Sequence, residues 1–111
     1  MYGTIMRAKM KKDCVREFLA LGKEWDARER TRAVGYISSE ILWDDKEEGR
    51  FAMVVHFTNR ETYRKNAESP EQDAFFRKMR ACLEGDPEWS DGVIEPWDST
   101  YARPPKWATE G

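Results

Sequence analysis

The chain has 111 residues, 40% of them hydrophobic, so it can form one domain that buries a core without a metal or a disulfide framework. Its 19 basic and 21 acidic residues nearly cancel, which removes the positive field that draws proteins to phosphate backbones, and we expect no nucleic acid partner. No apolar run reaches transmembrane length and the first residues lack the pattern of a signal peptide, so we expect no membrane partner and a cytoplasmic location.

The first two elements are predicted to be a strand and an amphipathic helix. Residues 2–10 alternate as a strand does. From about Asp13 to about Arg30, apolar side chains recur at helical spacing. They are Val15, Phe18, Leu19, Gly22 and Trp25.

A long β-hairpin is predicted next, with strands at 36–43 and 51–57 joined by a charged turn. Antiparallel pairing sets Trp43 opposite Phe51, Ile41 opposite Met53, Ser39 opposite Val55 and Ile37 opposite Phe57. One face is then nearly all apolar, and the second mixes polar and apolar groups. The mixed face carries Tyr36, Ser38, Glu40, Leu42, Ala52, Val54 and His56.

Two further helices and a last strand complete the order. A capping box with Thr58 as its cap predicts a short helix at 59–67. Ser69 as cap, Pro70 at the first helical position and Gln72 as the closing residue predict a second main helix, which stops at Gly85. Alternation over 89–97 around a central glycine predicts the strand.

The order β-α-β-β-α-β has few compact solutions. We predict an α+β fold, a ferredoxin-like plait with a four-stranded antiparallel sheet in the strand order 4-1-3-2 and both main helices on one face. This domain spans 1–98, and 99–111 form an extended tail. We expect the two main helices to run in the same direction, so that Cys14 and Cys82 lie at opposite ends, and we expect neither a disulfide nor a metal site.

Over residues 2–97 the chain resembles the antibiotic biosynthesis monooxygenases, also called the dimeric α+β barrel family. The resemblance rests on the opening strand and on short matches along the rest of the chain. These are Tyr36 and Glu40 in the first hairpin arm, Arg50-Phe51 at the start of the second, FTNRETY at 57–63, Ser69-Pro70 at a helix start, and DPEWSDG at 86–92.

The resemblance implies a homodimer whose two sheets pack face to face into a barrel, with a ligand cavity between each sheet and its helices. It implies activities such as cofactor-free oxygenation of polycyclic phenols, haem degradation or isomerisation of small metabolites. Haem-degrading members carry an Asn in the first strand and a His on the helix after the third strand. Here the first strand has no Asn, and the one histidine, His56, lies within the third strand.

Candidate site residues follow from the predicted faces. A cavity lined by aromatic rings and a few hydroxyl groups suits a planar aromatic ligand, although the same residues could form an ordinary aromatic core. The candidate substrate-binding residues are Trp25, Ser39, Trp43, Met53, Phe57, Tyr63 and Phe75. His56 is a candidate general base, or a structural histidine satisfied by Glu40 or Ser38.

We therefore expect a small monooxygenase-like protein that binds an aromatic small molecule and works without a cofactor. The alternatives are a haem-binding or haem-degrading protein and a non-catalytic dimeric module for small molecules. A space between sheet and helices filled by Trp25, Trp43 and Phe75 would favour the module. We also expect an obligate homodimer, with Tyr101 and Trp107 of the tail packing on the partner.

Overall fold

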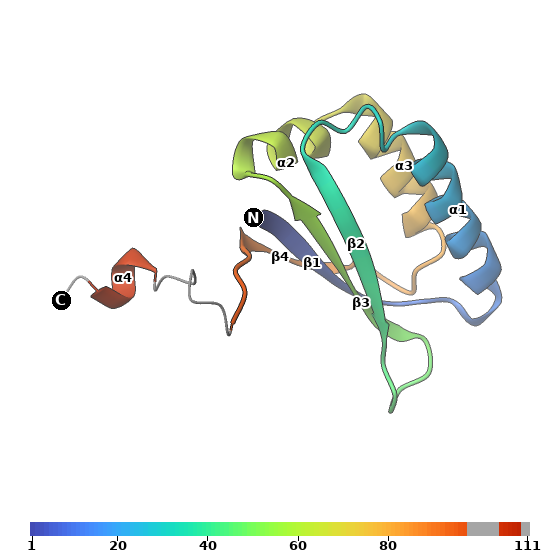
Figure 1. The fold of residues 1–111 in the computed structure, drawn as a ribbon. Helices are drawn as coiled ribbons and strands as arrows, with labels where there is room; N and C mark the ends of the chain where they lie inside the picture. The colour runs from blue at the N-terminus through green and yellow to red at the C-terminus, as the bar shows by residue number, and fades with distance from the viewer. Residues whose placement is uncertain (98–104, 110–111) are drawn as a thin grey trace.

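The computed structural model describes residues 1–97 and 105–109, and in it the chain folds as a four-stranded sheet with helices on one face (Figure 1). The strands are β1 (Tyr2–Lys9), β2 (Tyr36–Trp43), β3 (Arg50–Phe57) and β4 (Glu88–Val93). The helices are η1 (Lys12–Cys14), α1 (Val15–Arg28), α2 (Arg60–Ala67), α3 (Pro70–Arg80) and α4 (Lys106–Thr109).

The sheet has the order β2-β3-β1-β4, and every neighbouring pair is antiparallel. The prediction of a ferredoxin-like α+β plait is confirmed. The hairpin register is confirmed for Trp43 opposite Phe51, Ile41 opposite Met53 and Ser39 opposite Val55.

At its start, β2 departs from the predicted register. The pairing shifts between Tyr36 and Ser38, so that Tyr36, and not Ile37, lies opposite Phe57. Because one extra residue in a strand reverses which side chains point to each face, Tyr36 moves to the helix-covered side. There its ring lies 4.7 Å from that of Trp25 on α1, so its assignment to the mixed face was wrong.

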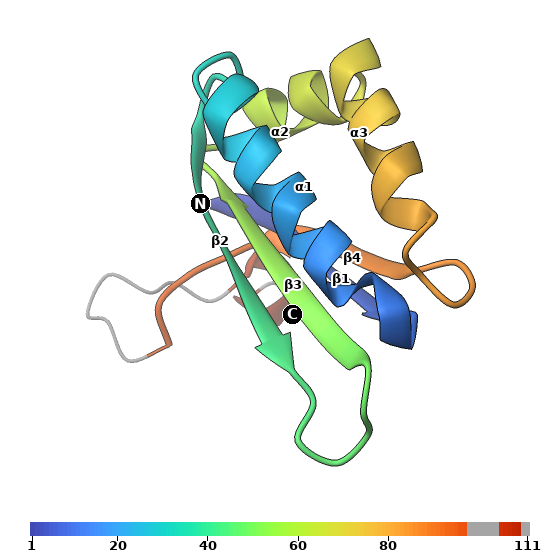
Figure 2. The ribbon, with the colours of Figure 1, turned by 90° about the vertical axis from the view of Figure 1, so that its right-hand side faces the viewer.

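The core lies between the sheet and the two main helices. In Figure 2, α1 lies over the sheet between α3 and the edge strand β2. The most deeply buried side chains are those of Phe51, Phe57, Met6, Met10 and Leu83.

Both predicted helix caps exist, with a change of residue in one. In α2 the cap is Asn59 and not Thr58, because the Asn59 Oδ1 accepts the hydrogen bond from the Thr62 amide at 2.9 Å. In α3 the Ser69 Oγ accepts from the Gln72 amide at 3.1 Å, as predicted. The Gln72 side chain does not close the box, because its oxygen accepts from the indole of Trp25.

Two elements are shorter than their sequence patterns. The helix α3 ends at Arg80, five residues before Gly85, and Leu83 beyond it forms an isolated β-bridge with Met10, the residue after β1. The last strand covers 88–93 instead of 89–97. In the tail, Tyr101 lies outside the described residues, and Lys106–Thr109 form a helical turn instead of extended chain.

The relative direction of the two main helices was predicted wrongly. The end of α1 meets the start of α3, since the Trp25 Nε1 donates to the Gln72 Oε1 at 3.1 Å. The start of α1 meets the end of α3, where Cys14 and Cys82 are close neighbours. The helices are antiparallel because each follows one strand of the antiparallel pair β1 and β3.

The helices α1, α2 and α3 all lie on one face of the sheet, and none of these three covers the second face (Figures 1 and 2). We call it the open face. Its most exposed apolar side chain is Leu42, with 64% of its surface accessible. Its residues, by their alternation along the strands, include Ile5, Arg7, Glu40, Leu42, Ala52, Val54 and His56.

Candidate functional site

Aromatic rings gather on the helix-covered side of the sheet, at the end where α2 begins. The Tyr36 ring lies 5.6 Å from that of Phe57, which lies 5.7 Å from that of Tyr63. The ring of Trp25 contacts that of Tyr36 edge-on, and it lies 6.5 Å from the ring of Phe75 of α3. We call these five residues the aromatic cluster. It joins α1, α2, α3 and both hairpin strands.

Each polar tip of the aromatic cluster has a partner. The Tyr36 hydroxyl and the Ser39 Oγ are 2.8 Å apart, and this pair lies at the exposed edge of the sheet. The Tyr63 hydroxyl donates to the Asp91 Oδ1 at 3.2 Å. A flat ring with a phenolic oxygen would therefore find both stacking surfaces and hydroxyl donors here.

Tyr63 is the titratable group of the cluster with a perturbed acidity. Burial raises the pKa of its phenol, and the nearby carboxylate of Asp91 raises it further. A phenol with a raised pKa stays protonated and can donate a hydrogen bond, but it is a poor proton acceptor. Tyr63 is therefore suited to orient a ligand and not to act as a base.

The remaining predicted binding residues divide between surface and core. Trp43 lies at the far end of β2 with 41% of its surface exposed, 5.5 Å from the ring of Phe51. Met53 packs against the core, and Phe57 is only 1% exposed, so it is a packing residue in this conformation. The structure thus brings Trp25, Phe57, Tyr63 and Phe75 together and leaves Trp43 apart from them.

The helix-covered side has an exposed margin along β2. Because β2 is an edge strand and α1 lies further in, Ser39 and Trp43 keep contact with solvent. On α1, Leu19 is 48% exposed. A side chain added at Gly22 would meet no atom within 4 Å. We call this margin the β2 strip, and it consists of Ser39, Ile41 and Trp43 of β2.

His56 lies on the open face, away from the aromatic cluster. As predicted it pairs with Ser38 across the strands, and its Nε2 is 2.6 Å from the Glu40 Oε2. Its Nδ1 is buried without a hydrogen-bond partner among the described residues. A ligand between sheet and helices in the same chain would be separated from His56 by the sheet itself.

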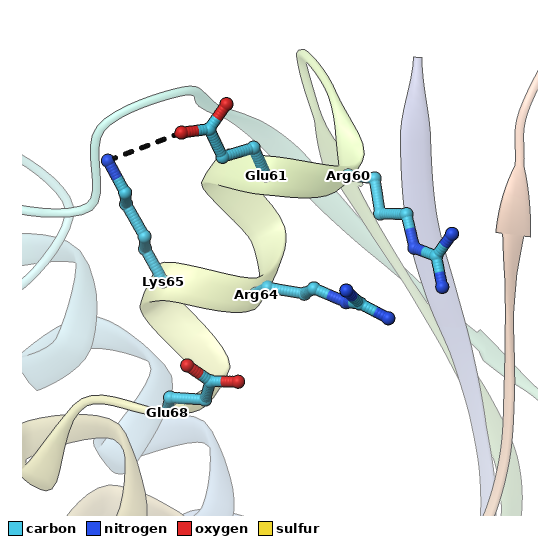
Figure 3. A pocket seen from close by; sticks show the side chains of 5 residues that line it. All are labelled: Arg60, Glu61, Arg64, Lys65 and Glu68. Carbon is cyan, nitrogen blue, oxygen red and sulfur yellow. Dashed lines mark ion pairs between the residues drawn. The ribbon is translucent and has the colours of Figure 1, made fainter.

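Neither of two surface depressions on the described residues lies between the sheet and the helices. One, of about 210 Å³, runs between α1 and α3 beside Trp25 and Phe75. The other lies over the charged surface of α2 alone (Figure 3). There Glu61 pairs with Lys65 at 3.6 Å, while Arg60 and Arg64 point away from that pair.

The sequence did not single out Tyr36, Gln72 or Asp91 as site residues. Tyr36 belongs to the aromatic cluster, and Gln72 and Asp91 form hydrogen bonds with it. Tyr36 was missed because nothing in the sequence marks the bulge at Ile37. The alternation of 89–97 could have placed Asp91 on the helix-covered face, since it lies opposite Thr4 of β1.

Comparisons with known proteins identify the fold. No family model matches the chain, and neither does any curated protein sequence. Solved structures do match, among them an antibiotic biosynthesis monooxygenase, with 18% identity over 86% of this chain and 100% of that one and a TM-score of 0.67. The fold is that of the antibiotic biosynthesis monooxygenases. The resemblance seen in the sequence is thereby confirmed.

Two other solved structures are also similar to this chain. SnoaB, a cofactor-independent oxygenase from Streptomyces nogalater, shares 14% identity over 86% of this chain and 94% of its own, with a TM-score of 0.68. A conserved protein from Methanosarcina mazei shares 16% identity over 85% of this chain and 92% of its own, with a TM-score of 0.72.

No described helix of this chain is long and apolar enough to cross a membrane.

Proposed function

We propose that this protein is a cofactor-independent monooxygenase-like enzyme that takes a flat, electron-rich aromatic substrate on the helix-covered side of its sheet. The observation that carries the proposal is the exposed pair of hydroxyl groups on Tyr36 and Ser39, held 2.8 Å apart beside the ring of Trp25. Support also comes from the fold, which is shared with a cofactor-independent oxygenase.

In the proposed reaction the substrate supplies the electrons. A phenol or a related ring with an acidic CH₂ group loses a proton, and the anion reduces O₂. The CH₂ carbon becomes a carbonyl that holds one oxygen atom, and the second oxygen leaves as water. The protein then has to bind the ring, exclude water and stabilise the anion, and the hydroxyls of Tyr36 and Ser39 are suitable donors for that anion.

The substrate would reach the aromatic cluster along the β2 strip. Ser39 and Trp43 of the strip are exposed and Ile41 between them is half-buried, and Ser39 lies at the end nearest the aromatic cluster. Because His56 lies on the open face, the proposal gives it no part in proton transfer. A haem-binding role is not favoured either, because the Nε2 of the one histidine is already paired with the Glu40 carboxylate.

Oxygen uptake with a panel of phenols, naphthols and anthrones, without flavin and after treatment with a chelator, tests the proposal. We expect uptake by the unaltered protein, a loss of about tenfold or more in Ser39→Ala, and no loss in His56→Gln. Absence of uptake over the whole panel, in a protein with an intact circular dichroism spectrum, would refute the enzyme.

A second candidate is a non-catalytic module that binds an aromatic small molecule. It is favoured by the close packing of Phe57 and by the position of both depressions outside the layer between sheet and helices. Ligand binding that quenches the fluorescence of Trp25, without any uptake of oxygen, would identify this function. A Trp25→Phe variant gives the matched control for the fluorescence change.

We also propose a homodimer that joins the open faces of two copies and a cytoplasmic location. The dimer is supported by exposed Leu42 and by half-buried Val54 and Ile5, which lie on the face that α1, α2 and α3 leave uncovered. The location is supported by the sequence alone, because its two cysteines have no disulfide-framework spacing.

A further inference from the structure

Three groups that can bind a metal meet at the end of the molecule opposite α2. They are the thiols of Cys14 and Cys82 and the carboxylate of Glu17, and their ligand atoms all lie within 4.8 Å of one another. Cys14 precedes the first residue of α1, Glu17 lies in the first turn, and Cys82 follows the end of α3. Among the described residues, no other group of three His, Cys, Asp or Glu side chains is this close.

The backbone around these groups is fixed by hydrogen bonds that cross between the two segments. The Lys11 amide donates to the Cys82 carbonyl at 2.8 Å, and the Glu84 amide donates to the Lys9 carbonyl at 2.8 Å. Within its own segment, the Cys14 amide donates to the Lys11 carbonyl at 3.0 Å. The backbone therefore holds the two cysteines side by side, and Cys82 is only 4% exposed.

The chemistry of the three groups selects a particular class of ion. Thiolate sulfur favours soft and borderline cations, and a set of two sulfurs and one carboxylate oxygen suits tetrahedral Zn²⁺ with water as the fourth ligand. With metal-to-sulfur bonds of about 2.3 Å, the ligand atoms of a tetrahedral ion lie about 3.8 Å apart, so a contraction of about 1 Å or less would seat the ion.

We propose that Cys14, Glu17 and Cys82 form a binding site for a thiophilic cation of the zinc class. Two thiolates and a carboxylate around a divalent ion leave one negative charge in excess. The ammonium group of Lys11, which donates to the carbonyl of Ala81, the residue before Cys82, at 2.9 Å, supplies a positive charge beside this segment. The ion would tie the start of α1 to the end of α3.

A redox-active thiol pair is the competing use of these residues, and the surroundings oppose it. Cys82 is buried, with only 4% of its surface exposed, so an oxidant in solution reaches its sulfur poorly.

Titration of the reduced, full-length protein with Co²⁺ tests the site. We expect thiolate-to-cobalt charge-transfer absorption that saturates at one ion per chain and is abolished by Zn²⁺. Removing a ligand should weaken binding by at least as much as the loss of an outer-shell partner, about tenfold or more, in Cys14→Ser and in Glu17→Gln. Glu68→Gln, a change at the exposed residue that follows α2, is the matched control and should bind as the unaltered protein does.

Two results would overturn the site. The first is the absence of charge-transfer absorption in protein that is folded and reduced. The second is Co²⁺ binding of equal strength in Cys14→Ser. Cys82→Ala keeps a small apolar group in the core, so a loss of Co²⁺ binding there with an unchanged circular dichroism spectrum supports the site. Rapid formation of a Cys14–Cys82 disulfide with hydrogen peroxide, together with no metal binding, would favour the redox pair.

Discussion

Two glycines of this chain sit in opposite surroundings. Gly35 has a φ of 85°, and a Cβ added there would lie within 2.8 Å of side-chain atoms of Thr58 and Thr62. Gly22 is inside α1, and a Cβ there would meet nothing within 4 Å. The first position therefore requires glycine, while the second does not.

We predict opposite signs for the two alanine substitutions. Gly35→Ala should destabilise by about 1–2 kcal/mol from the left-handed backbone alone, with the contact on Thr62 adding to that. Gly22→Ala should stabilise by about 0.5–1 kcal/mol, because alanine loses less entropy in a helix. Urea denaturation of both variants measures this, and a stabilising Gly35→Ala would show that the loop before β2 is built differently.

Tyr63 should make the protein sensitive to alkali. Its pKa is raised in the folded state by burial, so the unfolded chain gives up the proton first as the pH rises. The contribution to stability is complete below the ordinary tyrosine pKa of about 10 and is lost as the pH rises from there through the folded-state pKa. Between pH 9 and pH 11 the urea midpoint should fall less in Tyr63→Phe than in the unaltered protein. Equal falls would assign the alkaline loss to other groups.

At the scale of elements, α3 depends on its first residue. The Ser69 Oγ accepts from the Gln72 amide, and Pro70 occupies the first helical position. We predict that Ser69→Ala costs about 1 kcal/mol of stability, and that Ser69→Asp, which can still accept the hydrogen bond, costs little. If both variants lose the same stability in thermal unfolding, the cap is not what holds this helix start.

Element types and strand order could be predicted from the sequence because they rest on periodicity and on few compact topologies. The register of Ile41 and Trp43 followed from the centre of the charged turn and antiparallel pairing. The position of Tyr36 could not be predicted, since a bulge inserts one residue without a sequence signal. The direction of α3 was deducible from the antiparallel pairing of β1 and β3, and the error there hid the proximity of Cys14 and Cys82.

The candidate site was predictable in part, because periodicity decides on which face of a helix or strand a side chain lies. Trp25, Phe57, Tyr63 and Phe75 meet because their faces follow from helix and strand periods. Trp43 lies apart from them because it stands at the opposite end of β2, a distance along the strand that facing alone does not reveal. The partner of the Trp25 indole, Gln72, had been assigned to a cap, and only packing of α1 on α3 decides between these roles.

At the scale of the whole molecule, the open face should decide the oligomeric state. In the proposed dimer Leu42→Asp would place two carboxylates in the interface, and we expect light scattering to show a monomer. Leu19→Asp, a comparable change on exposed α1, is the control and should leave the dimer intact. A full-length protein that is already monomeric would contradict the dimer.

The tail is expected to strengthen that dimer. Trp107 is 80% exposed in the single chain, and we predict that its ring packs on the second copy. A chain that ends at Asp98 should then form a weaker dimer, with a higher dissociation constant than that of the full chain. If sedimentation gives equal dissociation constants for the two chains, the tail has no role in the dimer, although the dimer itself is not contradicted.

The proposal of a cofactor-independent oxygenase is tested most directly by turnover under ¹⁸O₂. With a substrate that supports oxygen uptake, and with flavin and metal removed, the account predicts one ¹⁸O atom in the new carbonyl and one in water. It also predicts that Ser39→Ala slows incorporation while His56→Gln does not. Product without label, or no product from a folded protein across the aromatic panel, would contradict it.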